Sequence, residues 1–200
     1  TAFNVTAKFS ENVIGFDVGD ITVVNATKSS FIAVDGSTYT CDLTPTGAGN
    51  ITINVAAGAA QDAAANNNTA ATQVSVTYDA AAPTVAIQNA PAYKNNTTAF
   101  TVTVKFNENV TGFVAGDITV VNASKSNFVA VDGSTYTCDL TPSGAGNITI
   151  DVAAAVAQDA ASNNNTAATQ VSVTYDAVAP TVSINGAPTI VNSNALFTVT

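Results

Sequence analysis

The chain has 200 residues, of which 46% are hydrophobic and 10% are charged, with five lysines against fourteen acidic residues and a net charge of −9. With neither arginine nor histidine, it has no clustered basic surface for nucleic acid, whereas its acidity is compatible with divalent cations. No apolar run approaches the ~18 residues of a membrane helix, and no signal peptide is present. Because the chain begins at Thr1 rather than methionine, we expect a processed or excerpted piece, with any secretion signal upstream.

A repeat of 97 residues organises the chain. When Phe3–Val85 is aligned with Phe100–Val182, 15 of 83 positions differ. Each copy contains Asp-Ala-x-Ala-Pro-Thr-Val between two β-type runs, at Asp79–Val85 and at Asp176–Val182. Proline cannot donate to a strand ladder and disfavours helix before it, so each segment predicts a short, stiff joint between domains. Such self-similarity is typical of a tandem array.

The repeat period predicts the domain boundaries. We expect a first domain that lacks its first strand, a complete second domain and the first strands of a third, at residues 1–79, 80–176 and 177–200. Residues 195–200 repeat the phase of residues 1–6, so the chain starts inside one repeat and stops inside another.

Alternating apolar residues predict seven strands in the complete copy, separated by turns rich in Gly, Pro, Asn and Asp. The expected strands are Thr84–Gln88, Ala99–Phe106, Asp117–Asn122, Phe128–Val131, Thr135–Thr141, Asn147–Ala153 and Thr169–Tyr175. No window has a sustained helical period. The sequence therefore predicts an all-β protein of tandem immunoglobulin-like Greek-key β-sandwiches.

Several strings that recur in fixed order resemble the bacterial Ig-like repeats of large secreted surface adhesins. They are KFSENVIGF and KFNENVTGF, GDITVVNA, AVDGSTYTCDLTP, AQDAA-x-NNNTAAT and YDA-x-APTV, and they cover essentially the whole chain. The resemblance implies a sandwich fold, tandem arrangement, export, calcium at domain junctions and no enzymatic activity. One departure is that relatives carry Ala-Gly-Asn where this chain has Ala64-Ala65-Asn66 and Ala161-Ser162-Asn163, which removes the backbone freedom of glycine.

Strand direction predicts a cluster of acids at the joint. In the complete copy, alternate strands return to the end beside Asp79, which brings Glu108 and Asp159 there, with amide oxygens of Asn163 and Asn165 nearby. Calcium prefers six to eight hard oxygens, so this set predicts a calcium site that stiffens the joint. The equivalent positions in the other copies are Glu11, Asp62 and Asp176. The alternative is that these acids are solvated loop residues that cap turns.

Cys41 and Cys138 occupy equivalent positions on an apolar strand face. Because that face should be the core, they are predicted to be buried as small hydrophobic residues. One cysteine per domain cannot form an intradomain disulfide. A disulfide between chains is the alternative. A nucleophile is disfavoured because no histidine is present to activate it.

An enzyme is the weakest hypothesis, because the chain has no histidine, nucleophile elbow or phosphate loop. The favoured function is a non-catalytic, extracellular stalk or shaft segment of a cell-surface adhesin or filament, whose partners are neighbouring repeats or identical chains. One alternative is a filament subunit that donates the strand Thr181–Ile184 to the next copy, although residues 195–200 and 1–6 would then compete for one position. The other is a carbohydrate-binding module, which would need exposed aromatic side chains.

Overall fold

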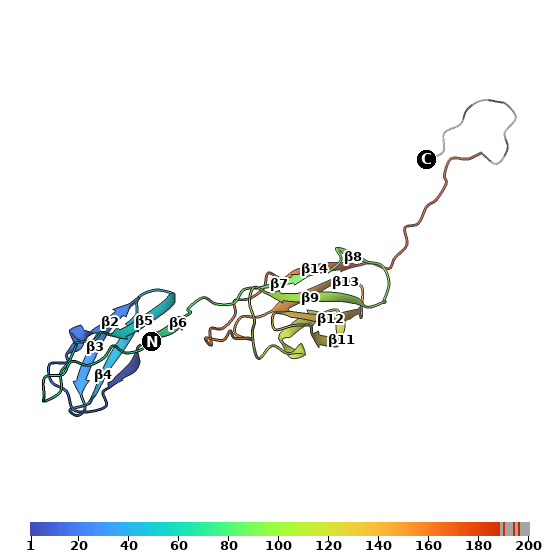
Figure 1. Cartoon of the computed structure of the whole chain (residues 1–200). Coiled ribbons are helices and arrows are strands. Elements are labelled where there is room, and N and C mark those ends of the chain that lie inside the picture. Colours follow the sequence, from blue (N-terminus) through green and yellow to red (C-terminus); the bar gives the residue numbers. More distant parts are fainter. Residues whose placement is uncertain (189, 191–193, 195, 197–200) are drawn as a thin grey trace. The chain divides into compact units, whose positions relative to one another are not determined.

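The computed structural model describes residues 1–188, 190, 194 and 196. They form two compact units, one of Thr1–Pro83 with Gln158–Asn165, and one of Thr84–Ala157 with the described residues from Thr166 onward. Each of the two repeats folds as its own set of β-sheets (Figure 1). No stretch of helix in this described part is long and apolar enough to cross a membrane.

The second repeat is a sandwich of two four-stranded sheets. One sheet has the order β11-β12-β9-β7, formed by Ala123–Ala130, Thr135–Pro142, Phe100–Phe106 and Val85–Gln88. The other has the order β10-β13-β14-β8, formed by Ile118–Val121, Gly146–Val152, Val171–Tyr175 and Tyr93–Lys94. This arrangement confirms the predicted immunoglobulin-like fold.

The sequence missed two short elements and part of a third. After β7 the chain crosses to the other sheet, where β8 pairs in parallel with β14, and a 3-10 turn, η2, spans Ala115–Asp117. β11 is also longer than predicted, because a bulge between Ser126 and Val129 interrupts its pairing with β12 without ending it. Asn127 within this bulge has a φ of 49°, in the left-handed region.

The core of the second repeat lies between the inner faces of its sheets. Val102, Val104 and Phe106 alternate along β9 and are fully buried, and they share one apolar cluster with Ile148 and Ile150 of β13. Burying each such side chain stabilises the fold by about 1.5–3 kcal/mol. Cys138 belongs to the same cluster, and the structure confirms that it and Cys41 are buried free thiols.

The first repeat has two three-stranded sheets, ordered β1-β4-β3 and β2-β5-β6. Their strands are Phe3–Lys8, Thr38–Pro45 and Ala26–Ala33, and Ile21–Val24, Gly49–Val55 and Val74–Tyr78, with a 3-10 turn, η1, at Val18–Asp20. β1 is therefore an edge strand, whereas its counterpart β9 is covered by β7. Val5, Ala7 and Phe9 are accordingly only half-buried.

The segment after β14 carries no strand in its described residues. Thr181–Ile184, which the sequence predicts as a strand, lies outside any sheet because it has no neighbouring strand with which to form a ladder. Val182 is 92% exposed and Ile184 is 78% exposed. Most of residues 195–200, the predicted start of a further strand, lie outside the described residues.

Candidate metal centre

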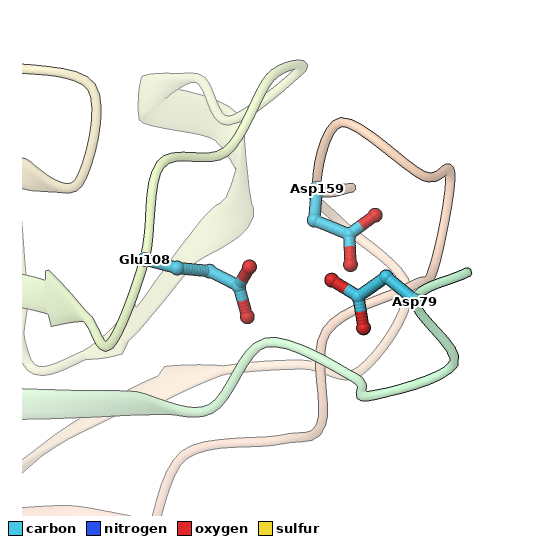
Figure 2. A group of neighbouring side chains, drawn as sticks. All are labelled: Asp79, Glu108 and Asp159. Carbon is cyan, nitrogen blue, oxygen red and sulfur yellow. The ribbon is translucent and has the colours of Figure 1, made fainter. Parts of the chain in front are cut away.

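Three acidic side chains from distant parts of the sequence come together. Asp79 follows β6, Glu108 follows β9, and Asp159 lies between β13 and β14. A carboxylate oxygen from each lies within 4.8 Å of one from the other two, and the three carboxylates point toward one another (Figure 2). Asp159 is buried and the other two are half-buried.

Asp159 organises the loop in which it lies. Its Oδ1 accepts hydrogen bonds from the backbone N–H groups of Ala161 and Asn163, at 2.8 and 2.9 Å, and its Oδ2 accepts from Asn163 Nδ2 at 2.9 Å. Burial raises the pKa of Asp159, but the hydrogen bonds from Asn163 and the neighbouring backbone outweigh it, so the pKa lies below its usual value. Asp159 is therefore held as a carboxylate.

Asn163 and Asn165 have different places in this loop. Asn163 Nδ2 also donates to the backbone carbonyl of Asp79 at 3.2 Å, which ties the loop to the segment after β6. Asn165 is buried. In its counterpart Asn68, both ends of the side-chain amide bond to the backbone. Oδ1 accepts from Ala60 N, and Nδ2 donates to the carbonyls of Ala56 and Thr69.

Asp79 and Asp176 make the same local turn. Asp79 Oδ1 accepts from Ala81 N, and Asp176 Oδ1 accepts from Val178 N, both at 2.9 Å. Each aspartate therefore caps its own turn, as the turn-capping hypothesis predicts, and Asp79 still has a second carboxylate oxygen that can face a cation. Asp176 is exposed.

In the first repeat the equivalent acids are more exposed to solvent than Glu108 and Asp159. Glu11 is exposed and Asp62 is half-buried. Asp62 makes the same loop contacts as Asp159, accepting from Ala64 N, Asn66 N and Asn66 Nδ2. These two acids belong to no group of three in the described residues, because no segment equivalent to Asp79 lies beside them.

The donor set of Asp79, Glu108 and Asp159 suits a hard cation. The three side chains offer carboxylate oxygens, which are ligands that Ca²⁺ prefers. The backbone carbonyl of Asp79, which accepts from Asn163 Nδ2, is a further oxygen in the same segment. Lys105 lies on the strand before Glu108, but its charge is directed to other groups. Its Nζ donates to the hydroxyls of Ser134 and Thr135, both at 2.7 Å. The residues present therefore fit calcium.

The glycine that this loop lacks has a structural consequence. Ala65 and Ser162 have φ values of 64° and 67°, in the left-handed region that glycine tolerates best. The departure from the Ala-Gly-Asn pattern thus leaves a non-glycine residue in a strained conformation. The positive φ values themselves could not be predicted from the residue types at these two positions.

Ser162→Gly is expected to stabilise the second repeat by about 0.5–1 kcal/mol, because the strain of a left-handed residue outweighs the backbone entropy that glycine adds. Denaturant unfolding of the whole chain measures the change. Ala161→Gly is the matched control, since residue 161 does not have a positive φ, and it should destabilise the repeat. Equal effects of the two substitutions would contradict this account.

Acid is expected to destabilise the fold below about pH 4. Asp132 Oδ1 accepts from Ser134 N and Oδ2 accepts from Thr135 Oγ1. Chiefly through the Ser134 backbone bond, these contacts lower the pKa of Asp132 from 3.8 to about 2. Since the folded pKa is the lower one, this stabilisation is complete above the unfolded pKa and is lost as the pH falls through about 2.

Urea midpoints measured between pH 7 and pH 2 test this expectation. The midpoint should fall mainly between pH 4 and pH 2, and Asp132→Asn should make that fall shallower. A midpoint that stays constant down to pH 2 would be inconsistent with the lowered pKa values.

The chain was compared with known families and structures. A family model described as "Bacterial Ig-like domain" matches residues 1–78 and again residues 79–175, and the second match contains all three acids. A search of curated proteins found no match.

Three of the solved structures that resemble this chain are bacterial surface proteins by their titles or names. Yersinia pseudotuberculosis InvD is 18% identical with a TM-score of 0.38, and the match covers 98% of this chain and 61% of that one. Invasin, titled a bacterial integrin-binding protein, is 14% identical with a TM-score of 0.38, covering 92% and 38%. The Y. pseudotuberculosis adhesin InvE is 16% identical with a TM-score of 0.31, covering 88% and 54%. The chain thus spans about 40–60% of the length of these proteins.

Proposed function

Because the chain belongs to the bacterial Ig-like domain family, we propose that it is a non-catalytic structural segment of an extracellular protein, a stalk or shaft of a cell-surface adhesin or filament. The observation that carries this proposal is the tandem sandwich, since two copies of one fold differ at only 15 of 83 aligned positions. A repeated scaffold adds length without adding a new site. The chemistry agrees, because the sequence contains no histidine.

Calcium is part of the proposal. Asp79, Glu108 and Asp159 would hold the ion, and Asn163 would keep Asp159 and the segment at Asp79 in place through its two hydrogen bonds. A bound Ca²⁺ would offset the mutual repulsion of three carboxylates. Binding would also fasten Asp79, at the start of the joint, to the loops that carry Glu108 and Asp159, and so stiffen the joint.

A carbohydrate-binding module is less well supported. Sugar-binding surfaces present exposed aromatic rings, and of the aromatic side chains in the described residues only Tyr93 is exposed. The rings of Phe106, Phe113 and Tyr136 instead pack against one another in the core, at centroid distances of 4.9–6.0 Å.

The mass and location of the native polypeptide test the structural role. An antibody against this chain should label intact cells, and on a denaturing, reducing gel it should detect a band far heavier than 20 kDa, because a stalk is a long covalent array. A band near 20 kDa would instead favour a subunit that polymerises. If the antibody labels only permeabilised cells, the protein lies inside the cell, and both structural roles would be contradicted.

A further inference from the structure

Ten asparagines of the chain begin an Asn-x-Thr or Asn-x-Ser triplet, the acceptor sequence for N-linked sugars. A chain rich in Asn and Thr contains such triplets by composition alone, so the triplet is not by itself a site. An acceptor side chain must also be exposed, and its Nδ2 must be available to form a new bond. The ten candidates are Asn4, Asn25, Asn50, Asn67, Asn95, Asn96, Asn109, Asn122, Asn147 and Asn164.

Four of these asparagines use Nδ2 within the fold. Nδ2 of Asn25 and Nδ2 of Asn122 each donate to a backbone carbonyl, at 2.7 and 2.9 Å. Nδ2 of Asn4 donates to an aspartate carboxylate at 2.9 Å, and Nδ2 of Asn96 donates to Asn95 at 3.1 Å. A sugar on any of the four would remove a hydrogen bond that the fold makes.

Five others hold the side chain against a neighbour through its oxygen or by packing. Asn109 packs against the turn at Gly133, where an added Cβ would lie 2.8 Å from its Oδ1. The other four accept a hydrogen bond through Oδ1, and they are Asn50, Asn67, Asn95 and Asn164.

Asn147 differs from all of these. It is exposed, and within the part of the chain that the structure describes its side chain makes no hydrogen bond; only its backbone carbonyl accepts one, from Asn122. Ile148 is completely buried, so its neighbours Asn147 and Thr149 both lie on the outer face of β13. The amide and the hydroxyl of this triplet therefore stand side by side on an open surface.

An exposed aromatic ring lies on the same face. Thr174 of β14 pairs with Asn147 on one side and with Tyr93 of β8 on the other. Paired residues point to the same side of a sheet, and Tyr93 is 78% exposed. The Cα atoms of Asn147 and Tyr93 are two strand spacings apart, or ~9.5 Å, with the small Thr174 side chain between them. A sugar on Asn147 can thus reach over the ring, whose apolar face suits the C–H face of a sugar.

We propose that Asn147 is an N-glycosylation site and that its first sugar packs over Tyr93. The donor is an oligosaccharide joined through a diphosphate to a membrane lipid, which the exporting cell supplies together with its transferase. Asn147 Nδ2 bonds to the anomeric carbon of the sugar as the bond from that carbon to the phosphate oxygen breaks. The lipid diphosphate leaves with the electron pair, and a base on the transferase takes one proton from Nδ2. The bound sugar covers exposed aromatic surface with a soluble, uncharged group.

Mass spectrometry of the protein isolated from its own cells tests the proposal. Cleavage before aspartate releases residues 139–150, in which Asn147 is the one asparagine. We expect this peptide to carry the added mass of a sugar chain. A peptide found only at its unmodified mass would overturn the proposal.

Variants made in the same cells show which atoms accept the sugar. Asn147→Gln and Thr149→Val should each lose the whole added mass, whereas Thr149→Ser keeps the hydroxyl and should retain it. Thr174→Val is the matched control, because it removes a hydroxyl from the same face of the neighbouring strand and leaves the triplet intact. An added mass that persists in Asn147→Gln, or equal losses in Thr149→Val and Thr174→Val, would contradict the assignment.

Tyr93→Ala tests where the sugar lies, and its exposed position leaves the fold intact. Enzymatic removal of the sugar should lower the transition temperature of the second repeat in the native protein but not in Tyr93→Ala, because only the native protein has a ring for the sugar to pack on. Equal shifts in the two proteins would overturn the placement over Tyr93.

The inference rests on the proposed extracellular role, since these sugars are added to exported chains. The two can nevertheless fail separately. An unmodified peptide from protein that labels at the cell surface overturns glycosylation alone, whereas the structural role is tested by the native mass and by surface labelling.

Discussion

Phe106→Ala is expected to lower the free energy of unfolding of the second repeat by about 3–5 kcal/mol, because removing a buried ring loses its transfer energy and leaves a cavity. Phe106 is completely buried, and its ring packs edge-on against Phe113 and Tyr136, at centroid distances of 5.2 and 6.0 Å. Calorimetry of the whole chain should show the transition of the second repeat shifting down by about 4 °C or more per kcal/mol.

Phe9→Ala is the matched control for this substitution. Phe9 occupies the equivalent position and contacts the equivalent rings of Phe16 and Tyr39, but it is only half-buried, directly after the edge strand β1. Its removal should therefore cost clearly less and should shift only the transition of the first repeat. Equal losses in the two variants would mean that the first core is as well closed as the second, contrary to the structure.

Calcium at about one hundred times its dissociation constant is expected to stabilise the second repeat by about 2.7 kcal/mol, because an ion that binds only the folded state shifts the unfolding equilibrium. The transition temperature should rise by about 10 °C or more for a domain of this size. The measurement is thermal melting of the chain with calcium and with a chelator, at a concentration where it is monomeric.

Three variants make the calcium experiment specific. Asp79→Asn removes one charge but keeps the oxygen that accepts from Ala81 N, so its turn should survive. Glu108→Gln removes a second charge. Each should reduce the calcium shift. Glu11→Gln should leave it unchanged, because Glu11 belongs to no group of three acids among the described residues. A melting temperature that does not respond to calcium would exclude a stabilising metal site and leave turn capping as the role of these acids.

Most of the sandwich could be predicted because its signals are local. The alternation of Phe100, Val102, Val104 and Phe106 requires a strand with one buried face, and turn residues mark where strands end. The convergence of Asp79, Glu108 and Asp159 could also be predicted, since strand direction alone decides which loops share one end of a sandwich. That these acids bind a metal stays a prediction.

The features that the sequence did not predict depend on long-range contacts. Tyr93–Lys94 is too short to show a pattern, and it becomes a strand only because β14 lies beside it. The pattern of Thr181–Ile184 matches that of a strand, yet strand formation also needs a partner, which the described residues do not supply. Asn163 was predicted to be a ligand through its amide oxygen, which stays a prediction, and a sequence cannot show that its amide nitrogen donates to Asp159 and to the backbone of Asp79.

Near-identical sandwiches at high local concentration are at risk of aggregating edge to edge, because an unpaired strand offers its backbone to any similar strand. In both repeats an edge strand, β3 or β11, has a bulge in its pairing, with Ser30 and Asn127 in left-handed conformations. A bulge twists an edge and prevents a flat, continuous ladder. The fold therefore discourages lateral, amyloid-like stacking through this edge of each sandwich.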